Sequence, residues 1–598
     1  MILSKLIRTF MLVIVGLFLI PGFLPDNSIR NVTPASASYN PVPADNYHAP
    51  LSSAALMAVT GARPSIQGSN MSSTQSMNSS NSLSGPKRID ENAIRFISDK
   101  SYFPQSETTI AVDPANPNHV LGGFQDTKYF FCQFLPGDCS TVSTSLSGFT
   151  VSIDGGHTVA KVSDLPSINV NRFFLVAWGD PSVAASVDGN FYYATLAINR
   201  GGSTGGNGIL LAKSNSSLFE PTISCATPYT YSTSNPCWKT VFVYGSADVP
   251  VFTLEDKDRI AVDQDPTSPY YGSVYIGWDH FLPLGGSQSY VARCDRDLLS
   301  CVLISGGDRP AVSGSDSFVA YTTPTVDKNG NLHVAWCNFG TFTTLGPVTC
   351  RIASSPPGGI QFGPPTNITS YMGSGTTLPS DTVVVGWATE QFRVAAGLIS
   401  ISADNSPKSN NLYFTTQVCT QGHFYKFPSY LAPVADDNPG ECEQSAVIIS
   451  QSADSGLSWS SPTIVSRPAV NDQPFVTVDP ERGTVYLVYY TTQYDSFNHR
   501  IDVVAAISNN AGRTFHQERI TTVSNEPDSD PNMYDYVAPA GFGGAFIVPQ
   551  YGDYFEATAQ DGTLWVLFTA NYQAEAGTFQ TDPFLAVINQ SNQSMNGA

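Results

Sequence analysis

Short apolar runs recur along the chain, and each is followed by an Asp in a turn and then by a second run rich in Tyr, Val and Trp. Runs of β-branched and aromatic residues bounded by turn residues predict strands, so each copy predicts a β-hairpin. An Asp suits such a turn because its carboxylate accepts backbone N–H bonds. Successive copies are 75, 75, 64, 77, 75 and 82 residues apart. The turn residues are Asp113, Asp188, Asp263, Asp327, Asp404, Asp479 and Asp561.

A repeat of near-constant length with several strands in each copy is typical of a propeller. We therefore predict an all-β fold, a seven-bladed β-propeller of four-stranded antiparallel blades, with six blades as the alternative. The seventh copy lacks a fourth strand, whereas the segment 93–98 (AIRFIS) precedes the first copy without a partner. We expect this N-terminal strand to complete the last blade, because closure of the ring removes exposed strand edges.

A second pattern, S-x-[DN]-x-G, follows the predicted third strand in three copies. Its residues are Ser152, Asp154, Gly156 and Thr158; Ser452, Asp454, Gly456 and Trp459; and Ser508, Asn510, Gly512 and Phe515. These segments resemble the Asp-box (BNR) repeat of the sialidase-like β-propeller superfamily, and the resemblance spans about residues 106–590. It implies that each box forms the turn from the third to the fourth strand, where the acid caps backbone donors, the Gly supplies a positive φ and the aromatic residue packs beneath. The boxes are expected to be structural and to lie away from the ligand face.

The N-terminal pattern predicts export. Lys5 and Arg8 precede an apolar stretch, and Ala35-Ser36-Ala37 matches a signal-peptide cleavage site. An uncleaved membrane anchor is the alternative. The predicted organisation is a signal peptide at 1–37, a Ser/Asn/Pro-rich flexible stalk at 38–90, the propeller at 91–590 and a C-terminal tail at 591–598. We expect a secreted or cell-surface protein with no membrane span in the mature chain.

The ten cysteines agree with export, because an even number of cysteines in an exported chain predicts disulfides. They lie as close neighbours along the chain, which favours pairing of neighbours, since short loops close at low entropic cost. A zinc site is the weaker interpretation, because the chain has no CxxC pair with a nearby His pattern. The predicted pairs are Cys132–Cys139, Cys225–Cys237, Cys294–Cys301, Cys337–Cys350 and Cys419–Cys442.

Composition excludes several functions. The chain has 29 Lys and Arg against 49 Asp and Glu, a formal net charge of -20. It therefore lacks the basic footprint that binding to nucleic acid or to an anionic membrane requires. The sequence also has no phosphate-binding P-loop, no HExxH motif and no GxSxG nucleophile elbow. We expect a monomer whose partner is a glycan or an extracellular protein.

Acidic residues recur just before the predicted first strands in five of the seven copies. In the superfamily that the chain resembles, the ligand face lies at this end of the blades. The acids are Glu107, Asp180, Asp256, Asp258, Asp472 and Asp553. Two interpretations are open: the acids line a pocket for a cation or a sugar, or they cap turns and face solvent.

Two functions from different classes follow as hypotheses. One is a recognition module for a glycan or protein, assisted by calcium. The other is an exo-sialidase-like glycoside hydrolase acting on surface or polymer glycans, which needs a Tyr nucleophile backed by a carboxylate and arginines that hold the sugar carboxylate. Its candidate residues are Asp553, Tyr554, Glu556, Arg259 and Arg393. The superfamily's early Phe-Arg-Ile-Pro segment is absent and its active sialidases have six blades, which favours the recognition module.

Calcium is the candidate cofactor. Two carboxylates 4 Å apart repel by about 1 kcal/mol in water, so crowded acids need a cation, an Arg or raised pKa values. We predict that calcium raises the melting temperature and that Asp553→Ala or Asp256→Ala weakens the rise, in thermal scans with calcium and with a chelator. Identical scans under both conditions would mean that the acids only cap turns.

Overall fold

The structure is a computed structural model that carries side chains. The predicted signal peptide, the predicted tail beyond residue 590 and nearly all of the predicted stalk lie outside the residues that it describes. In the described part of the chain, no helix is long and apolar enough to cross a membrane. The described residues are 63–64, 90–97, 105–126, 145–170, 173–199, 207–225, 235–245, 254–282, 286–339, 347–372, 383–384, 393–394, 398–422, 442–496, 500–525, 536–537, 551–572, 574–575, 578–579 and 581–589.

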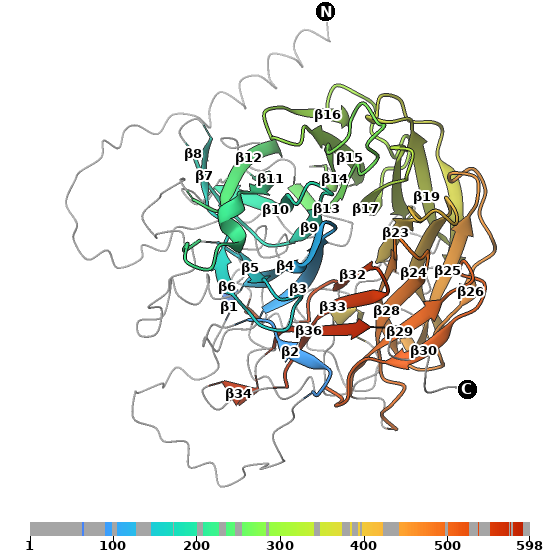
Figure 1. The fold of residues 1–598 in the computed structure, drawn as a ribbon. Helices are drawn as coiled ribbons and strands as arrows, with labels where there is room; N and C mark the ends of the chain where they lie inside the picture. The colour runs from blue at the N-terminus through green and yellow to red at the C-terminus, as the bar shows by residue number, and fades with distance from the viewer. Residues whose placement is uncertain are drawn as a thin grey trace, which may run out of the picture. The chain divides into compact units, whose positions relative to one another are not determined.

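Seven antiparallel sheets form the blades of a β-propeller, as the repeat predicted, and the six-blade alternative is wrong (Figure 1). Blade 1 consists of β3 (Gln105–Asp113), β4 (Asn116–Asp126), β5 (Ser147–Ser152) and β6 (Lys161–Asp164), and blade 2 of β9 (Ser182–Ala185), β10 (Phe191–Asn199), β11 (Asn207–Ser214) and β12 (Trp238–Gly245). Blade 3 consists of β13 (Leu254–Val262), β14 (Val274–Phe281), β15 (Ser287–Cys294) and β16 (Cys301–Ser305). Blade 4 consists of β17 (Val319–Val326), β18 (Leu332–Asn338), β19 (Pro347–Ser355) and β20 (Thr366–Met372). Blade 5 consists of β23 (Ile399–Ala403), β24 (Leu412–Gly422), β25 (Cys442–Ser452) and β26 (Thr463–Ile464). Blade 6 consists of β27 (Asn471–Val478), β28 (Val485–Thr491), β29 (Asp502–Ser508) and β30 (His516–Arg519). Blade 7 consists of β32 (Glu556–Gln560), β33 (Thr563–Ala570), β36 (Asp582–Asn589) and β2 (Ala93–Arg95).

A few short elements lie outside this pattern. Strands β7 (Ile168–Val170) and β8 (Phe173–Ala177) extend blade 2, and a 3-10 helix, η2 (Ser216–Phe219), follows β11. Three two-stranded pairs complete the described strands: β1 (Arg63–Pro64) with β31 (Tyr536–Val537), β21 (Val383–Val384) with β22 (Arg393–Val394), and β34 (Ala574–Glu575) with β35 (Thr578–Phe579).

The repeated Asp residues lie in the turns from the first to the second strand. Asp327 shows the pattern: its Oδ1 accepts N–H bonds from Asn329 at 2.9 Å and from Asn331 at 3.0 Å. Asp479 does the same in blade 6, and its other oxygen accepts the N–H of Gly562, in the corresponding turn of blade 7, at 2.6 Å. The predicted hairpins are confirmed, and the carboxylate of Asp479 also ties blade 6 to blade 7.

The three box segments form the turns between β5 and β6, β25 and β26, and β29 and β30. Ser152 Oγ donates to Asp154 Oδ1 at 2.7 Å and accepts the N–H of Gly156 at 2.9 Å, while Asp154 Oδ1 accepts the N–H of Thr158 at 2.9 Å. The same bonds recur in the other two boxes. The glycines have φ values of 96° at Gly156, 88° at Gly456 and 73° at Gly512, as the turn requires.

Each box also packs against the neighbouring blade. A Cβ at Gly156 of blade 1 would lie 2.7 Å from Leu585 of blade 7. The box aromatics pack inward, Trp459 with its ring centroid 6.3 Å from that of Phe414 and Phe515 against the cluster around Tyr413. These contacts fix the three turns against the neighbouring blades.

The apolar core fills the wedges between neighbouring blades. One cluster joins Tyr413 of blade 5 to Val476 and Leu487 of blade 6, and the side chains of Trp278 and Trp336 are fully buried in other wedges. Three of the predicted disulfides are confirmed: Cys225–Cys237, Cys294–Cys301 and Cys337–Cys350. The pairs Cys132–Cys139 and Cys419–Cys442 lie outside the residues whose side chains are described.

The N-terminal strand closes the ring, as expected. Strand β2 pairs with β36, and the N–H of Phe96 continues the pairing with the carbonyl of Pro583 at 2.8 Å. Arg95 Nε forms an ion pair with Asp582 at 2.6 Å. Just upstream, Asp90 Oδ2 accepts the N–H of Thr522 in blade 6 at 2.9 Å. The segment thus holds the last blade and attaches to the blade before it.

Deletion of the chain through Ser98 is predicted to destabilise the propeller, whereas deletion through Gly85 is predicted to leave it unchanged. Burial of Phe96 and Ile97 alone contributes about 3–6 kcal/mol, and the longer deletion also exposes the edge of β36. Thermal unfolding of the two truncated proteins, expressed behind the same leader, measures the difference. Equal melting temperatures would show that the closing strand is dispensable.

Candidate functional site

The first strand of four blades contains one extra residue near its start. In β3, β13, β17 and β27 the pairing with the second strand shifts there, for example between Ser106 and Thr109. A β-bulge of this kind changes the direction of a side chain. The bulged residue has a left-handed backbone in each case, and so does the residue just before Pro181 in blade 2. The five φ values are 53° at Glu107, 51° at Asp180, 56° at Lys257, 65° at Tyr321 and 49° at Gln473.

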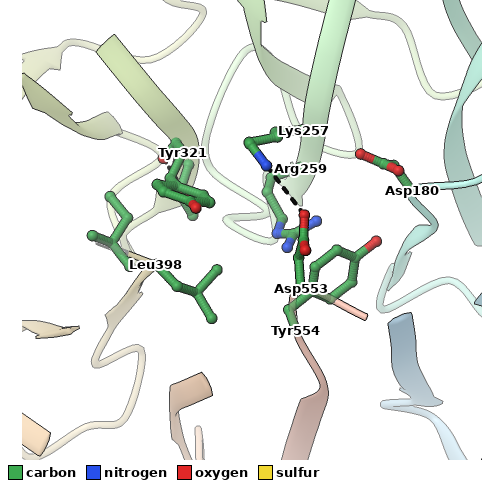
Figure 2. A pocket seen from close by; sticks show the side chains of 9 residues that line it. Asp180, Lys257, Arg259, Tyr321, Leu398, Asp553 and Tyr554 are labelled. Carbon is green, nitrogen blue, oxygen red and sulfur yellow. Dashed lines mark hydrogen bonds and ion pairs between the residues drawn. The ribbon is translucent and has the colours of Figure 1, made fainter. Parts of the chain in front are cut away.

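Side chains from this level of the propeller meet in a small cavity, which we call the axial pocket (Figure 2). They come from blades 2, 3, 4, 5 and 7. The cavity has a volume of about 10 Å³, which is the space that one water molecule needs. Its lining residues are Asp180, Lys257, Arg259, Tyr321, Thr323, Leu398, Ile399, Asp553 and Tyr554.

The segment 551–556, which leads into the first strand of blade 7, reaches across to several other blades. Tyr554 Oη donates to the carbonyl of Pro181 in blade 2 at 2.8 Å, and Gln473 Nε2 of blade 6 donates to the carbonyl of Gly552 at 2.6 Å. Lys257 Nζ of blade 3 pairs with Asp553 Oδ2 at 3.2 Å. Gly552 has a φ of 78°, and a Cβ there would lie 2.7 Å from the backbone nitrogen of Glu107. Only glycine allows this close passage.

Arg259 separates the axial pocket from the central channel. Its guanidinium lies over the ring of Tyr554, 3.6 Å from the centroid, and its Nε is 3.8 Å from Glu556 Oε1. Thr109 Oγ1 donates to the other oxygen of Glu556. Beyond them is a cavity of about 410 Å³ lined by the first strands of all seven blades. Arg259 and Glu556 border this channel, and Arg259 borders the axial pocket as well.

In the described part of the chain, two buried carboxyl groups receive no hydrogen bond from another residue. Asp180 and Asp258 are both fully buried, and no described residue donates a hydrogen bond to either oxygen of either group. Burial raises the pKa of Asp180 well above its usual range, and the carboxylates of Glu107 and Asp256 raise it further. Burial likewise raises the pKa of Asp258 well above its usual range, against the lowering effect of Arg259. Both groups therefore hold their proton up to a higher pH than an exposed Asp does.

The other predicted acids are buried in the same region with partners. Asp256 Oδ1 accepts the N–H of Lys257 at 3.0 Å, and Asp472 Oδ1 accepts Gln417 Nε2 at 2.8 Å. Burial raises the pKa of Asp472 well above its usual range and also raises that of Glu556. None of the predicted acids faces solvent.

One part of the prediction was wrong. Glu107, Asp256, Asp258 and Asp472 lie inside the first strands rather than in loops before them, because the bulge adds a residue without ending the strand.

Tyr554 is not placed as an activated nucleophile. Its side chain is buried, its hydroxyl donates to a backbone carbonyl, and burial raises the pKa of the phenol well above its usual range. A phenol nucleophile needs the opposite shift. Its ring instead supports the guanidinium of Arg259. Arg393 lies in β22, where no side chain is described.

Sequence reasoning missed Lys257, Tyr321, Leu398 and Gln473. Each lies six residues before the repeated turn Asp of its copy, as Glu107 does. Aligning the copies on that Asp would have marked this position. The side chain at this position is an acid, a base, a phenol, an amide or an alkyl group in different copies. A search for acidic residues alone therefore did not identify the position.

Metal binding is not supported by the described residues alone. Among them, no group of three His, Cys, Asp or Glu side chains is arranged to hold a metal ion. Calcium therefore stays a prediction.

No protein-family model matches the chain, and no curated protein matches its sequence. The chain is similar to the polysaccharide lyase Uly1, with a TM-score of 0.39, 10% identity and coverage of 83% of this chain and 92% of that one. It is similar to the α-L-arabinofuranosidase Arb93A from Fusarium graminearum, with a TM-score of 0.37, 9% identity and coverage of 84% and 99%. For Trypanosoma rangeli sialidase the TM-score is 0.35, the identity is 10%, and the match spans 70% of this chain and 57% of the sialidase. Likenesses of this size assign neither a family nor an activity.

Asp258→Asn is predicted to stabilise the protein at pH 8 by at least about 1 kcal/mol and to have almost no effect at pH 4. The pKa of Asp258 is raised by folding, so the folded chain keeps a proton that the unfolded chain loses, and the free energy of unfolding falls as the pH rises above the ordinary value near 4. An amide has the same shape and does not ionise. Chemical denaturation at both pH values measures the effect.

Asp297→Asn is the matched control. Asp297 is exposed, and its hydrogen bond with Lys213 lowers its pKa, so this substitution should slightly destabilise the protein at pH 8. A stability change for Asp258→Asn that is the same at both pH values would show that its carboxyl group ionises normally.

Proposed function

We propose that the protein is an exported recognition propeller that binds a glycan at the axial pocket. The position of five strained residues carries the proposal. A non-glycine residue held in a left-handed conformation costs about 1–3 kcal/mol, and such strain is concentrated at binding and catalytic sites. Here the strain falls at one level of five blades, at Glu107, Asp180, Lys257, Tyr321 and Gln473.

The chemistry of these groups suits a polyhydroxylated ligand. Carboxyl, ammonium, phenol and amide groups lie close together, and a few fixed polar groups in a mainly closed setting are what orient a small polar ligand. The pocket admits one group of the ligand rather than a whole ring, because its volume is only about 10 Å³. The rest of the glycan would lie along the end of the propeller where the first strands begin.

Export is supported by the three disulfides, which form and persist in oxidising compartments. Secretion, a monomeric state and calcium assistance stay predictions, and an extracellular protein remains the other kind of ligand.

A glycoside hydrolase is the second candidate. The observation in its favour is that Asp180, Asp258 and Glu556 are buried carboxyl groups with raised pKa values. A carboxyl group that keeps its proton at neutral pH is what a general acid requires. The position of Tyr554 disfavours the tyrosine-nucleophile form of this reaction.

Glycan-array binding followed by calorimetry tests the proposal. The double variant Lys257→Met/Asp553→Asn removes both charges of the buried pair together, so that neither is left unpaired. We predict that it keeps its melting temperature within a few degrees and loses at least tenfold in affinity for any glycan that the wild type binds. Lys239→Met, on the outer strand of blade 2, is the control and should bind normally.

Two outcomes would redirect the assignment. Unchanged affinity in the double variant would place the binding site elsewhere. Release of new reducing ends from a bound glycan, lost in Asp180→Asn while the affinity is kept, would favour the hydrolase.

A further inference from the structure

Carboxyl groups outnumber cationic side chains around the axial pocket. In the described part of the chain, the cations there are Lys257 and Arg259. Both are engaged, Lys257 with Asp553 and with the ring of Tyr321 at 4.9 Å, and Arg259 with Tyr554 and Glu556. The acids of the same neighbourhood are Glu107, Asp180, Asp256, Asp258, Asp472, Asp553 and Glu556. Of these acids, Asp180 and Asp553 line the pocket itself.

Asp180 is the lining acid whose acceptor capacity is unused. It is fully buried, and neither of its oxygens receives a hydrogen bond from a described residue. In Figure 2 its carboxyl group points from blade 2 toward the pair formed by Lys257 and Asp553. The charge of Lys257 acts on Asp180, but that ammonium is directed to Asp553.

The backbone prevents Asp180 from turning away. The N–H of Trp178 donates to Leu196 at 2.9 Å, and the N–H of Leu196 donates to the carbonyl of Gly179 at 3.2 Å. On the other side, the ring of Pro181 fixes its own φ, and its carbonyl accepts the hydroxyl of Tyr554. The backbone of the left-handed Asp180 is thus fixed between two anchored neighbours, and its side chain is buried rather than at the surface.

We propose, building on the glycan-binding function above, that the axial pocket receives the free ammonium group of an amino sugar and that Asp180 accepts its hydrogen bonds. The cavity is about the size of one water molecule, and an ammonium group is of similar size. An ammonium group supplies three donors and a positive charge, whereas a sugar hydroxyl supplies one donor and no charge. Charge-assisted bonds of this kind are about twice as strong as neutral ones.

A calcium ion is less suited to this place. Calcium takes six to eight oxygen ligands, and the described residues contain no group of three acidic, His or Cys side chains arranged for a metal. An N-acetyl group is also less suited, because it replaces two of the donors by an acyl group that is larger than the cavity. The ligand class is therefore a glycan in which at least one hexosamine is not acetylated.

The test compares two trisaccharides of β-1,4-linked glucosamine that differ at one nitrogen. One is fully N-acetylated and the other has a single free amine, so that non-specific attraction to the acidic protein stays small. Calorimetry in about 150 mM salt should give at least tenfold tighter binding of the amine form to the wild type, which is about 1.4 kcal/mol. Asp180→Asn should bind the two sugars equally.

Two further variants serve as checks. Asp561→Asn also removes one negative charge, but from an exposed turn in blade 7, and it should keep the preference for the amine. Asn is accepted at left-handed positions, and Asp180→Gly removes the strain altogether, so at least one Asp180 variant should fold. For both Asp180 variants we expect a melting temperature equal to or above that of the wild type, because neither substitution removes a hydrogen bond made by another described residue.

The outcomes separate this inference from the proposed function. If both sugars bind the wild type equally and Lys257→Met/Asp553→Asn abolishes binding, glycan recognition stands and the amine preference is overturned. If neither sugar nor any other glycan binds, both are overturned. If calcium without sugar raises the melting temperature and Asp180→Asn removes that rise, the pocket is a metal site and the inference fails.

Discussion

Closure of the ring by β2 is the interaction on which the rest of the structure depends. A propeller blade buries its faces only against its two neighbours, so an open ring would leave two blades each with one exposed apolar face and one free edge. Here the last blade takes its fourth strand from residues 93–95, and Asp90 and Arg95 attach that strand to blade 6 and to β36. The inner strands of blade 7 also meet blade 1 at the bridge between Thr108 and Phe555, so the outer pairing of β2 supports the ring in which the axial groups meet.

The axis combines two costs that folding normally avoids. Five non-glycine residues are held in left-handed conformations, and several carboxyl groups are buried within reach of one another. Proximity of like charges and loss of water both raise the carboxyl pKa values, so protonation relieves part of the repulsion. Two cations reduce the remaining repulsion between the carboxylates. Lys257 pairs with Asp553, and Arg259 lies near Glu556 and over the ring of Tyr554. No other described residue donates a hydrogen bond to Asp180 or Asp258, which is an unusual state for a buried acid.

Blade 7 differs from the others at this point, and the difference shapes the site. The segment 551–556 reaches Pro181, Lys257 and Gln473 of three other blades, and it passes Glu107 of blade 1 at Gly552. Its residues Asp553 and Tyr554 line the axial pocket, and Glu556 lines the cavity of about 410 Å³; Arg259 borders both spaces. A repeat fold thus obtains an asymmetric site from one segment of blade 7 that crosses to other blades.

The sequence by itself determined the features that depend on local bonding and on period. The turn Asp residues, the box turns at Gly156 and Gly456, the strand at 93–98 and the disulfides formed by near neighbours all follow from contacts within a few residues or from counting copies. Only the tertiary structure decided the rest. The bulges at Glu107 and Lys257 arise from register between paired strands, which no local pattern records. Whether Asp180 is unpaired while Asp553 binds Lys257 depends on side chains brought together from blades hundreds of residues apart. Burial, and with it the raised pKa of Asp180, is a property of the closed ring and not of any segment of the chain.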